Sequence, residues 1–272
     1  MTASGNNAPV GIFDSGIGGL TVARAIFAQL PGESTIYFGD TARVPYGPKS
    51  PETVRRYSIE ILDWLLGQGV KAVVIACNTS TAHALEALRA ASPVPVIGVI
   101  EPGARAAAQV TRGGPIGVIG TVGTIASNAY ARAIHAIAPA VQVEQKACPL
   151  FVPFVEEGWF DRPALELVAR EYLASLQAAR VDTLVLGCTH YPLLKALLGR
   201  VMGPTVTLID SAEETALELA RVLATCGITA AGGGPVSHRF VVSDDEARFR
   251  QVGARFIGER LAGAGAEVVP LG

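Results

Sequence analysis

Two cysteines with similar neighbours are the residues of this sequence best suited to chemistry. Cys77 lies between the apolar run KAVVIA and the polar residues NTS, and Cys188 lies between TLVLG and TH. A cysteine at the start of a helix faces free N–H groups and the positive end of the helix dipole, which favour an anion. We therefore predict that the pKa of Cys77 is lowered from its usual value of about 8.5. The alternative is that both are small buried core residues, a common role for cysteine.

Two thiols in one cleft allow two kinds of chemistry. They can pair as a redox dithiol, or one thiolate can remove a proton from a carbon while the other thiol donates one from the opposite side. The second reaction inverts a stereocentre, and the residues alone leave both open. Cys148 and Cys226 lack polar neighbours of this kind, and we interpret both as structural. Because the cysteines form no CxxC or Cys/His cluster, neither a disulfide framework nor a zinc site is favoured.

Polar residues elsewhere could assist the two thiols. Asp14 begins the stretch DSGIGG, which resembles a dinucleotide-binding loop but is followed by Thr21 where that motif requires glycine. Its glycines would instead let the backbone approach a small ligand. Asp14 could meet an ammonium group, tune a thiol or simply cap a helix. His190 could orient or protonate Cys188, or serve only as a structural histidine.

Two further stretches could border a site. Asp40, Tyr46 and Gly47 lie on the loop GDTARVPYGPKSP, which could fold over a ligand or form a rigid surface turn at its prolines. Glu156 precedes a second glutamate and a glycine in CPLFVPFVEEGWF. A solvated acidic pair is the simpler interpretation of that segment.

The elements that must position these residues alternate between strand and helix. In the first half we predict strands near 10–13, 34–38, 71–76 and 93–100, and helices near 20–30, 51–66 and 82–91. Strands that alternate with helices of this length indicate parallel βαβ units and an α/β fold. Ligands of such folds bind beyond the carboxyl ends of the strands, where we place Asp14, Cys77, Thr121, Cys188 and Asp210.

The pattern then starts again. We predict strands near 115–119, 141–146, 183–186 and 205–209, and helices near 128–137, 163–179 and 192–201. GIFDSGIGGLTVARAI can be laid over GVIGTVGTIASNAYARAI with a small insertion, which indicates a duplicated α/β lobe with the site between the two copies, unless the likeness is coincidental. The tail adds a strand near 238–242, a helix capped by Asp244 that runs to about 261, and a strand near 267–271.

Composition sets the class of protein. The chain has 272 residues, of which half are hydrophobic and 17% are charged, and a net charge of −2. These values indicate one large or two small globular domains and give no electrostatic reason to expect a nucleic-acid partner. The opening MTASGNNAP is unlike a signal peptide, and no apolar run reaches the roughly 18 residues of a membrane span. We therefore expect a soluble, cytoplasmic protein without a membrane partner.

Seven stretches carry a resemblance to a known family. GIFDSGIGGLTV, YFGDTARVPYG, ACNTSTA, GVIEPG, LFVPFVEEG, GCTHYPLL and DSAEETA resemble glutamate racemase, of the aspartate/glutamate racemase superfamily. The likeness runs in register from Val10 to about Arg221, and HRFVVSDD in the tail also fits. It implies an isomerase that interconverts L- and D-glutamate with two cysteines, without a cofactor or metal. Cys77 would take the α-proton from D-glutamate and Cys188 from L-glutamate.

The resemblance also implies roles for neighbouring residues. Asp14 would support Cys77 or the substrate ammonium group, and His190 would support Cys188. Asp40 and Glu156 match acidic positions of secondary importance to catalysis. The implied substrate contacts are Asp14, Ser15, Tyr46, Gly47, Asn78, Thr79, Thr121, Thr189 and His190.

The resemblance further implies a fold, an assembly and a pathway. The first α/β lobe would comprise residues 1–98 plus 209–272 and the second 99–208, related by internal pseudo-symmetry, and the enzyme would form a homodimer. D-Glutamate would supply peptidoglycan biosynthesis, and with it cell wall biogenesis and cell shape, in a bacterium. The rival interpretations are an aspartate racemase or another isomerase of the superfamily, a dithiol redox protein, and a non-catalytic amino-acid-binding module.

Overall fold

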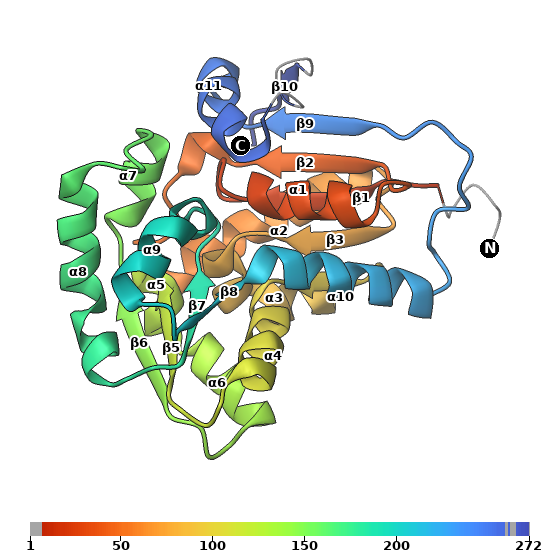
Figure 1. Ribbon diagram of the computed structural model, residues 1–272. Helices are drawn as coiled ribbons and strands as arrows, with labels where there is room; N and C mark the ends of the chain where they lie inside the picture. Colours follow the sequence, from red (N-terminus) through yellow and green to blue (C-terminus); the bar gives the residue numbers. More distant parts are fainter. Residues whose placement is uncertain (1–6, 259–260, 262–264, 272) are drawn as a thin grey trace.

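Two parallel β-sheets flanked by helices form the molecule (Figure 1). The structure is a computed structural model that describes residues 7–258, 261 and 265–271. All strand pairs of both sheets are parallel. The first sheet has the order β10 (Ala266–Val268), β9 (His238–Val242), β2 (Thr35–Gly39), β1 (Val10–Asp14), β3 (Ala72–Ile75) and β4 (Val96–Gly98). The second has the order β6 (Val143–Ala147), β5 (Ile116–Gly120), β7 (Thr183–Gly187) and β8 (Thr207–Asp210).

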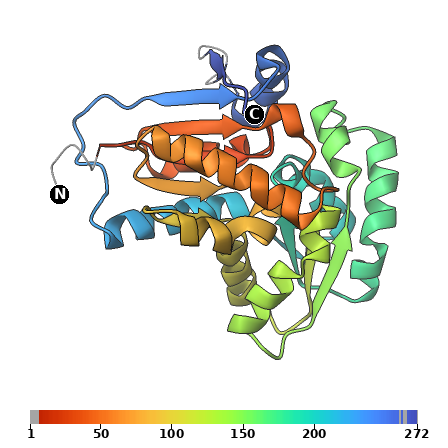
Figure 2. The ribbon, with the colours of Figure 1, turned by 180° about the vertical axis from the view of Figure 1, so that it is seen from behind.

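Helices cover both faces of the first sheet (Figures 1 and 2). Successive residues of a strand point to opposite faces, so Ile12 packs with Leu20 on one side of the sheet and Phe13 packs with Leu62 on the other. Both faces of the central strand are therefore buried. The helices of this half of the molecule are α1 (Leu20–Gln29), α2 (Pro51–Gly67), α3 (Asn78–Ala91), α10 (Ser211–Thr225) and α11 (Glu246–Ile257), with the short 3₁₀ helix η1 (Thr41–Arg43).

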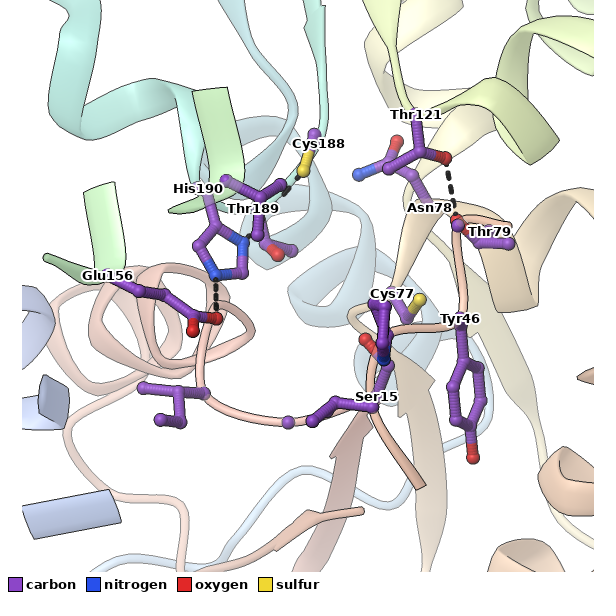
Figure 3. A pocket seen from close by; sticks show the side chains of 16 residues that line it. Ser15, Tyr46, Cys77, Asn78, Thr79, Thr121, Glu156, Cys188, Thr189 and His190 are labelled. Atoms are coloured by element: carbon purple, nitrogen blue, oxygen red, sulfur yellow. Dashed lines mark hydrogen bonds and ion pairs between the residues drawn. The ribbon is translucent and has the colours of Figure 1, made fainter. Parts of the chain in front are cut away.

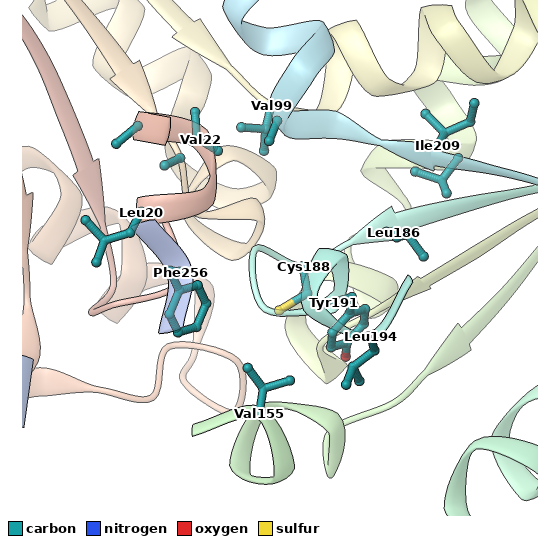
Figure 4. Close-up of a cluster of buried hydrophobic side chains, with 14 of the residues drawn as sticks. Leu20, Val22, Val99, Val155, Leu186, Cys188, Tyr191, Leu194, Ile209 and Phe256 are labelled. Carbon is teal, nitrogen blue, oxygen red and sulfur yellow. The ribbon is translucent and has the colours of Figure 1, made fainter. Parts of the chain in front are cut away.

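The second sheet has its own helices and shares a core with the first. Leu20 and Phe256 lie in one buried cluster with Val155 and Tyr191, so apolar packing is continuous behind Cys188 (Figure 4). Helix α10 contacts both α1 and α4, the helix at residues 100–110, and so joins the two halves. The helices of the second half are α4 (Ile100–Val110), α5 (Val122–Ala126), α6 (Ala129–Ile137), α7 (Phe151–Glu156), α8 (Pro163–Ala178) and α9 (Lys195–Met202), with the 3₁₀ helix η2 (Tyr191–Leu194).

The two sheets repeat one strand order. The sequence β2-β1-β3-β4 of the first sheet corresponds to β6-β5-β7-β8 of the second, and β9 and β10 extend only the first. Cys77 follows β3 and Cys188 follows β7, which are corresponding strands. The predicted α/β fold of two similar lobes with parallel sheets and internal pseudo-symmetry is confirmed. The division at residues 98 and 208 stays a prediction, while the second sheet itself extends to Asp210.

Several predicted boundaries differ from the structure. Asp245 rather than Asp244 caps α11, because its Oδ1 accepts the N–H of Arg248 at 2.9 Å whereas the carboxylate of Asp244 accepts the N–H of Asp245. Helix α3 begins at Asn78, four residues earlier than predicted, because Cys77 itself caps it. The predicted helix 192–201 divides into η2 and α9. The strand predicted near 267–271 is β10, which spans Ala266–Val268. The predicted end of the preceding helix, near 261, lies partly outside the described residues. Among the described helices, none has the length and hydropathy needed to cross a membrane.

Candidate active site

Loops from both sheets meet around one cavity that contains both cysteines (Figure 3). Cys77 and Cys188 are 5% and 6% exposed, so each sulfur is buried but borders this space. Figure 3 shows them approaching it from opposite sides. The lining consists of Ser15, Gly16, Ile17, Val44, Pro45, Tyr46, Gly47, Cys77, Asn78, Thr79, Thr121, Val152, Glu156, Cys188, Thr189 and His190. All residues predicted to contact substrate are among them, with the exception of Asp14.

The thiol of Cys77 holds its proton tightly. Its Sγ caps α3 and accepts the N–H of Ser80 at 3.4 Å, as expected for a helix N-terminus. Burial nevertheless raises the pKa of Cys77 to about 11, with a further contribution from the charge of Asp14, and these effects outweigh the hydrogen bonds from Ser80 and Ser15. The predicted lowering of this pKa is therefore wrong. The helix terminus acts as expected, but desolvation and a nearby carboxylate are stronger.

Asp14 lies behind the cavity rather than on its wall. Its carboxyl group is 1% exposed, and Oδ2 accepts the N–H of Gly16 at 3.0 Å. Burial raises the pKa of Asp14, while the charge of His190 and the N–H groups of the loop oppose that rise. Oδ1 is buried without a hydrogen-bond partner among the described residues. Asp14 thus places a poorly solvated acid beside Cys77.

A chain of charges supports Cys188. His190 Nδ1 lies 3.9 Å from Cys188 Sγ, and Nε2 of the same ring lies 3.1 Å from Glu156 Oε1. Burial by itself lowers the pKa of His190, but the hydrogen bonds to Cys188 and Glu156 outweigh it and raise that pKa to about 10. The imidazole is therefore positively charged at neutral pH, and this charge lies beside Cys188 Sγ.

Glu156 connects this histidine to the first half of the molecule. Its Oε2 accepts from Arg248 Nη2 of α11 at 3.2 Å. Burial raises the pKa of Glu156, yet its contacts with His190 and Arg248 lower it overall, so the carboxylate stays ionised. Arg248 was not predicted from the sequence. No local pattern could have found it, because its partner lies 92 residues away along the chain.

Hydroxyl groups join the two sides of the cavity. Thr79 Oγ1 lies 2.9 Å from Thr121 Oγ1, and Thr121 caps α5 by accepting the N–H of Thr124 at 3.2 Å. Thr21 donates to the backbone oxygen of Thr189 at 3.1 Å. The threonine that breaks the dinucleotide motif therefore anchors the loop that follows Cys188.

Tyr46 and Asp40 hold the loop that was predicted to border a site. The Tyr46 ring points away from the cysteines (Figure 3), and its hydroxyl donates to Asp40. Asp40 is fully buried and also accepts from Arg43 Nε at 2.7 Å and Ser243 Oγ at 2.8 Å. Asp40 thus fixes the loop whose backbone borders the cavity, while Gly47 contributes its backbone oxygen to a 2.9 Å hydrogen bond from Gly123 N.

With both thiols and their partners in place, the arrangement is suited to moving protons at a carbon atom. One side has a thiol that keeps its proton, and the other has a sulfur beside a charged imidazole. An acid and a base on opposite sides of one buried site are what inversion of a stereocentre requires.

Comparison with known proteins also indicates an enzyme that inverts a stereocentre. Residues 15–219 match the Asp/Glu/Hydantoin racemase family. A glutamate racemase of Geobacter metallireducens is 58% identical over 252 residues, covering 93% of each chain. The crystal structure of the glutamate racemase isoform RacE1 of Bacillus anthracis has a TM-score of 0.90 and 44% identity, covering 98% of each chain. A Francisella tularensis glutamate racemase, solved in complex with D-glutamate, has a TM-score of 0.90 and 39% identity, again covering 98% of each chain.

These matches show that the chain belongs to the Asp/Glu/Hydantoin racemase family and is an isomerase. Within that family, relatives that resemble it over nearly its whole length include glutamate racemases of Geobacter metallireducens, Syntrophus aciditrophicus and Bacillus anthracis. The resemblance drawn from the seven sequence stretches is confirmed.

Proposed function

We propose that the protein interconverts L- and D-glutamate by a two-base mechanism in which Cys77 and Cys188 work on opposite faces of the α-carbon. The observation that carries this proposal is the pair of thiols that border one cavity from opposite sides with unlike partners. The glutamate racemases among its relatives, one of them solved with D-glutamate, support glutamate as the substrate.

The proton inventory of the reaction balances. From L-glutamate, the thiolate of Cys188 takes the α-proton, and the carbanion then takes the proton of the Cys77 thiol from the other face. D-Glutamate leaves an enzyme with a Cys188 thiol and a Cys77 thiolate, which is the state that acts on D-glutamate in reverse. His190 stabilises the Cys188 thiolate, and burial with the charge of Asp14 makes the Cys77 thiolate a strong base.

The carbanion needs stabilisation because an α-proton is much less acidic than a thiol. Preorganised donors in a desolvated site supply this most effectively. The cavity offers the amide nitrogen of Asn78, which has no partner among the described residues, and the hydroxyl groups of Thr79 and Thr121. The N-terminus of α3 adds backbone N–H groups and a favourable dipole for a carboxylate. Metal and cofactor groups have no role in this scheme.

The biological setting is part of the same proposal. D-Glutamate produced in the cytoplasm would supply peptidoglycan biosynthesis, and so cell wall formation and cell shape, and the enzyme would act as a homodimer. The division into lobes 1–98 plus 209–272 and 99–208 lies close to where the chain passes from the first sheet to the second, after β4, and back again, after β8.

Deuterium incorporation tests the mechanism. In deuterated water, the protein should racemise glutamate and place deuterium at the α-carbon. Cys77→Ser and Cys188→Ser should each lose racemisation by about 10²- to 10⁴-fold or more, because each removes an acid or base. Cys226→Ser, at an exposed free cysteine, is the matched control and should keep full activity. Full activity in either active-site variant would overturn the two-base mechanism.

The same preparations separate the rival functions. A chiral assay with glutamate and aspartate distinguishes the two amino-acid racemases. A dithiol redox protein would show a Cys77–Cys188 disulfide by mass after alkylation without reductant. A binding module would bind glutamate but leave the α-carbon free of deuterium.

A further inference from the structure

A buried phenol of the second half of the molecule contacts an amide of the first half at the edge of the cavity. The hydroxyl of Tyr130, on α6, donates to Asn78 Oδ1 at 2.7 Å. Tyr130 is fully buried and Asn78 is 3% exposed, so water does not compete for this bond. Asn78 is the first residue of α3, directly after Cys77, and lines the cavity.

The other end of the amide is available to a ligand. Asn78 Nδ2 is buried and has no hydrogen-bond partner among the described residues. In Figure 3 the amide nitrogen points toward the space between the two cysteines. A buried N–H group without an acceptor is unfavourable unless a ligand supplies one. A carboxylate oxygen is the acceptor that would gain most from this donor.

The direction of the Asn78 amide depends on Tyr130. An asparagine amide has an acceptor end and a donor end of nearly the same shape, so its hydrogen-bond partners decide which end faces a ligand. Burial raises the pKa of Tyr130, so the phenol keeps its proton. The phenol donates this proton to Asn78 Oδ1 at 2.7 Å, so Nδ2 is left facing the cavity.

The Tyr130 ring is itself held in place by close backbone neighbours. A Cβ atom added at Gly187, which ends β7 next to Cys188, would lie 2.9 Å from Tyr130 Cε2. One added at Gly103 of α4 would lie 3.5 Å from the Tyr130 hydroxyl. These two glycines leave room for the ring and limit its movement.

We propose that Tyr130 is a positioning residue that holds the Asn78 amide with its N–H directed at a substrate carboxylate. This inference rests on the proposed function, since it assigns the carboxylate to glutamate. Tyr130 does not touch the reacting atoms and acts only through Asn78. In its absence, the amide oxygen could turn toward the carboxylate and repel it.

Tyr130→Phe tests this role. We expect the KM for L-glutamate and for D-glutamate to rise by about 3- to 10-fold, with kcat little changed. A change of this size corresponds to the free energy of one hydrogen bond to a charged group. Tyr172→Phe is the matched control, because it removes another phenol of the same half, one whose hydrogen-bond partner among the described residues is the N–H of Leu150. Its KM should be unchanged.

A double-mutant cycle distinguishes positioning from a structural effect. In an Asn78→Ala background, Tyr130→Phe should raise KM no further, because its target is gone. An equal rise in that background, or no rise in the single variant, would overturn the inference. Should Tyr130→Phe fail to fold, Asn78→Asp keeps an acceptor for the phenol but replaces the N–H by a second oxygen, and it should raise KM by about tenfold or more. An unchanged KM in Asn78→Asp would overturn the inference.

Calorimetric titration with D-glutamate keeps this test separate from the proposed function. The dissociation constant reports on the contact between the Asn78 amide and the substrate whether or not turnover occurs. A wild-type protein that binds but does not racemise contradicts the proposed function, while a dissociation constant unchanged by Tyr130→Phe contradicts the role of Tyr130.

Discussion

His190 Nε2 lies 3.1 Å from Glu156 Oε1, and this contact fixes the ring that faces Cys188. The carboxylate helps raise the pKa of His190 to about 10, so the imidazole keeps its proton across the neutral range and loses it only as the pH rises through that value. The ion pair thus keeps a positive charge beside Cys188 across the neutral pH range.

Glu156→Gln should move the alkaline limit of activity. Removing the carboxylate lowers the pKa of His190, so the ring loses its charge at lower pH. We expect the alkaline limb of kcat/KM for L-glutamate to shift down by about one pH unit or more. Glu157→Gln, at the exposed neighbour, is the control. A limb that stays in place in Glu156→Gln would show that His190 does not need this carboxylate.

Asp14→Asn should make the Cys77 thiol more acidic. The negative charge of Asp14 contributes to the raised pKa of Cys77, so its removal lowers that pKa and increases the thiolate fraction at a given pH. In a Cys188→Ser background, we expect alkylation of Cys77 at pH 8, followed by peptide mass, to be about tenfold faster. Asp63→Asn, at an exposed carboxylate on α2, should have no effect. Equal rates in the two variants would contradict the assigned cause.

Gly18→Ala should inactivate the enzyme through the loop of Cys188. A Cβ at Gly18 would overlap Thr189 Oγ1 and the His190 ring, so the loop must move away from the cavity. Because small misplacements of reacting groups are costly, we expect kcat/KM to fall by about 10²-fold. Gly32→Ala introduces a Cβ with nothing within 4 Å and should keep wild-type activity. Full activity in Gly18→Ala would mean that this contact does not position the loop.

Lys71 and Glu33 should matter for stability rather than for catalysis. Lys71 Nζ lies 2.6 Å from Glu33 Oε2, and the two side chains are 4% and 3% exposed. Lys71→Met leaves a buried carboxylate without its charge partner, and we expect a loss of about 3–5 kcal/mol in the free energy of unfolding by urea. Lys71→Met combined with Glu33→Gln should recover most of it, because Gln still accepts the N–H of Ala230.

An exposed ion pair provides the comparison for that measurement. Arg170 and Glu166 are 59% and 40% exposed, so Arg170→Ala should cost less than about 1 kcal/mol. Similar losses in the free energy of unfolding of Arg170→Ala and Lys71→Met would show that burial does not make the Lys71–Glu33 pair more important for stability than an exposed pair.

Much of this molecule could be predicted from its sequence. Apolar runs before Cys77 and Cys188, each followed by polar residues, predicted two strands, one in each lobe, whose carboxyl ends face the crevice between the lobes. Both sulfurs do border one cavity. The faint repeat predicted a duplicated lobe, and the sheets have the same strand order. These features are local, because strand and helix periodicity and turn residues are encoded within a few positions.

The behaviour of each group was decided only by the tertiary structure. The helix N-terminus at Cys77 predicted a lowered pKa, but burial and Asp14 raise it. Asp40 was assigned from the sequence only to a loop that could fold over a site, and the fold adds that it accepts from Arg43 and Ser243 and so supports that loop. The contacts of Arg248 with Glu156 and of Tyr130 with Asn78 join residues 92 and 52 positions apart. Desolvation and the charges of distant residues depend on which segments pack together, and this packing cannot be predicted from the residues adjacent in the chain.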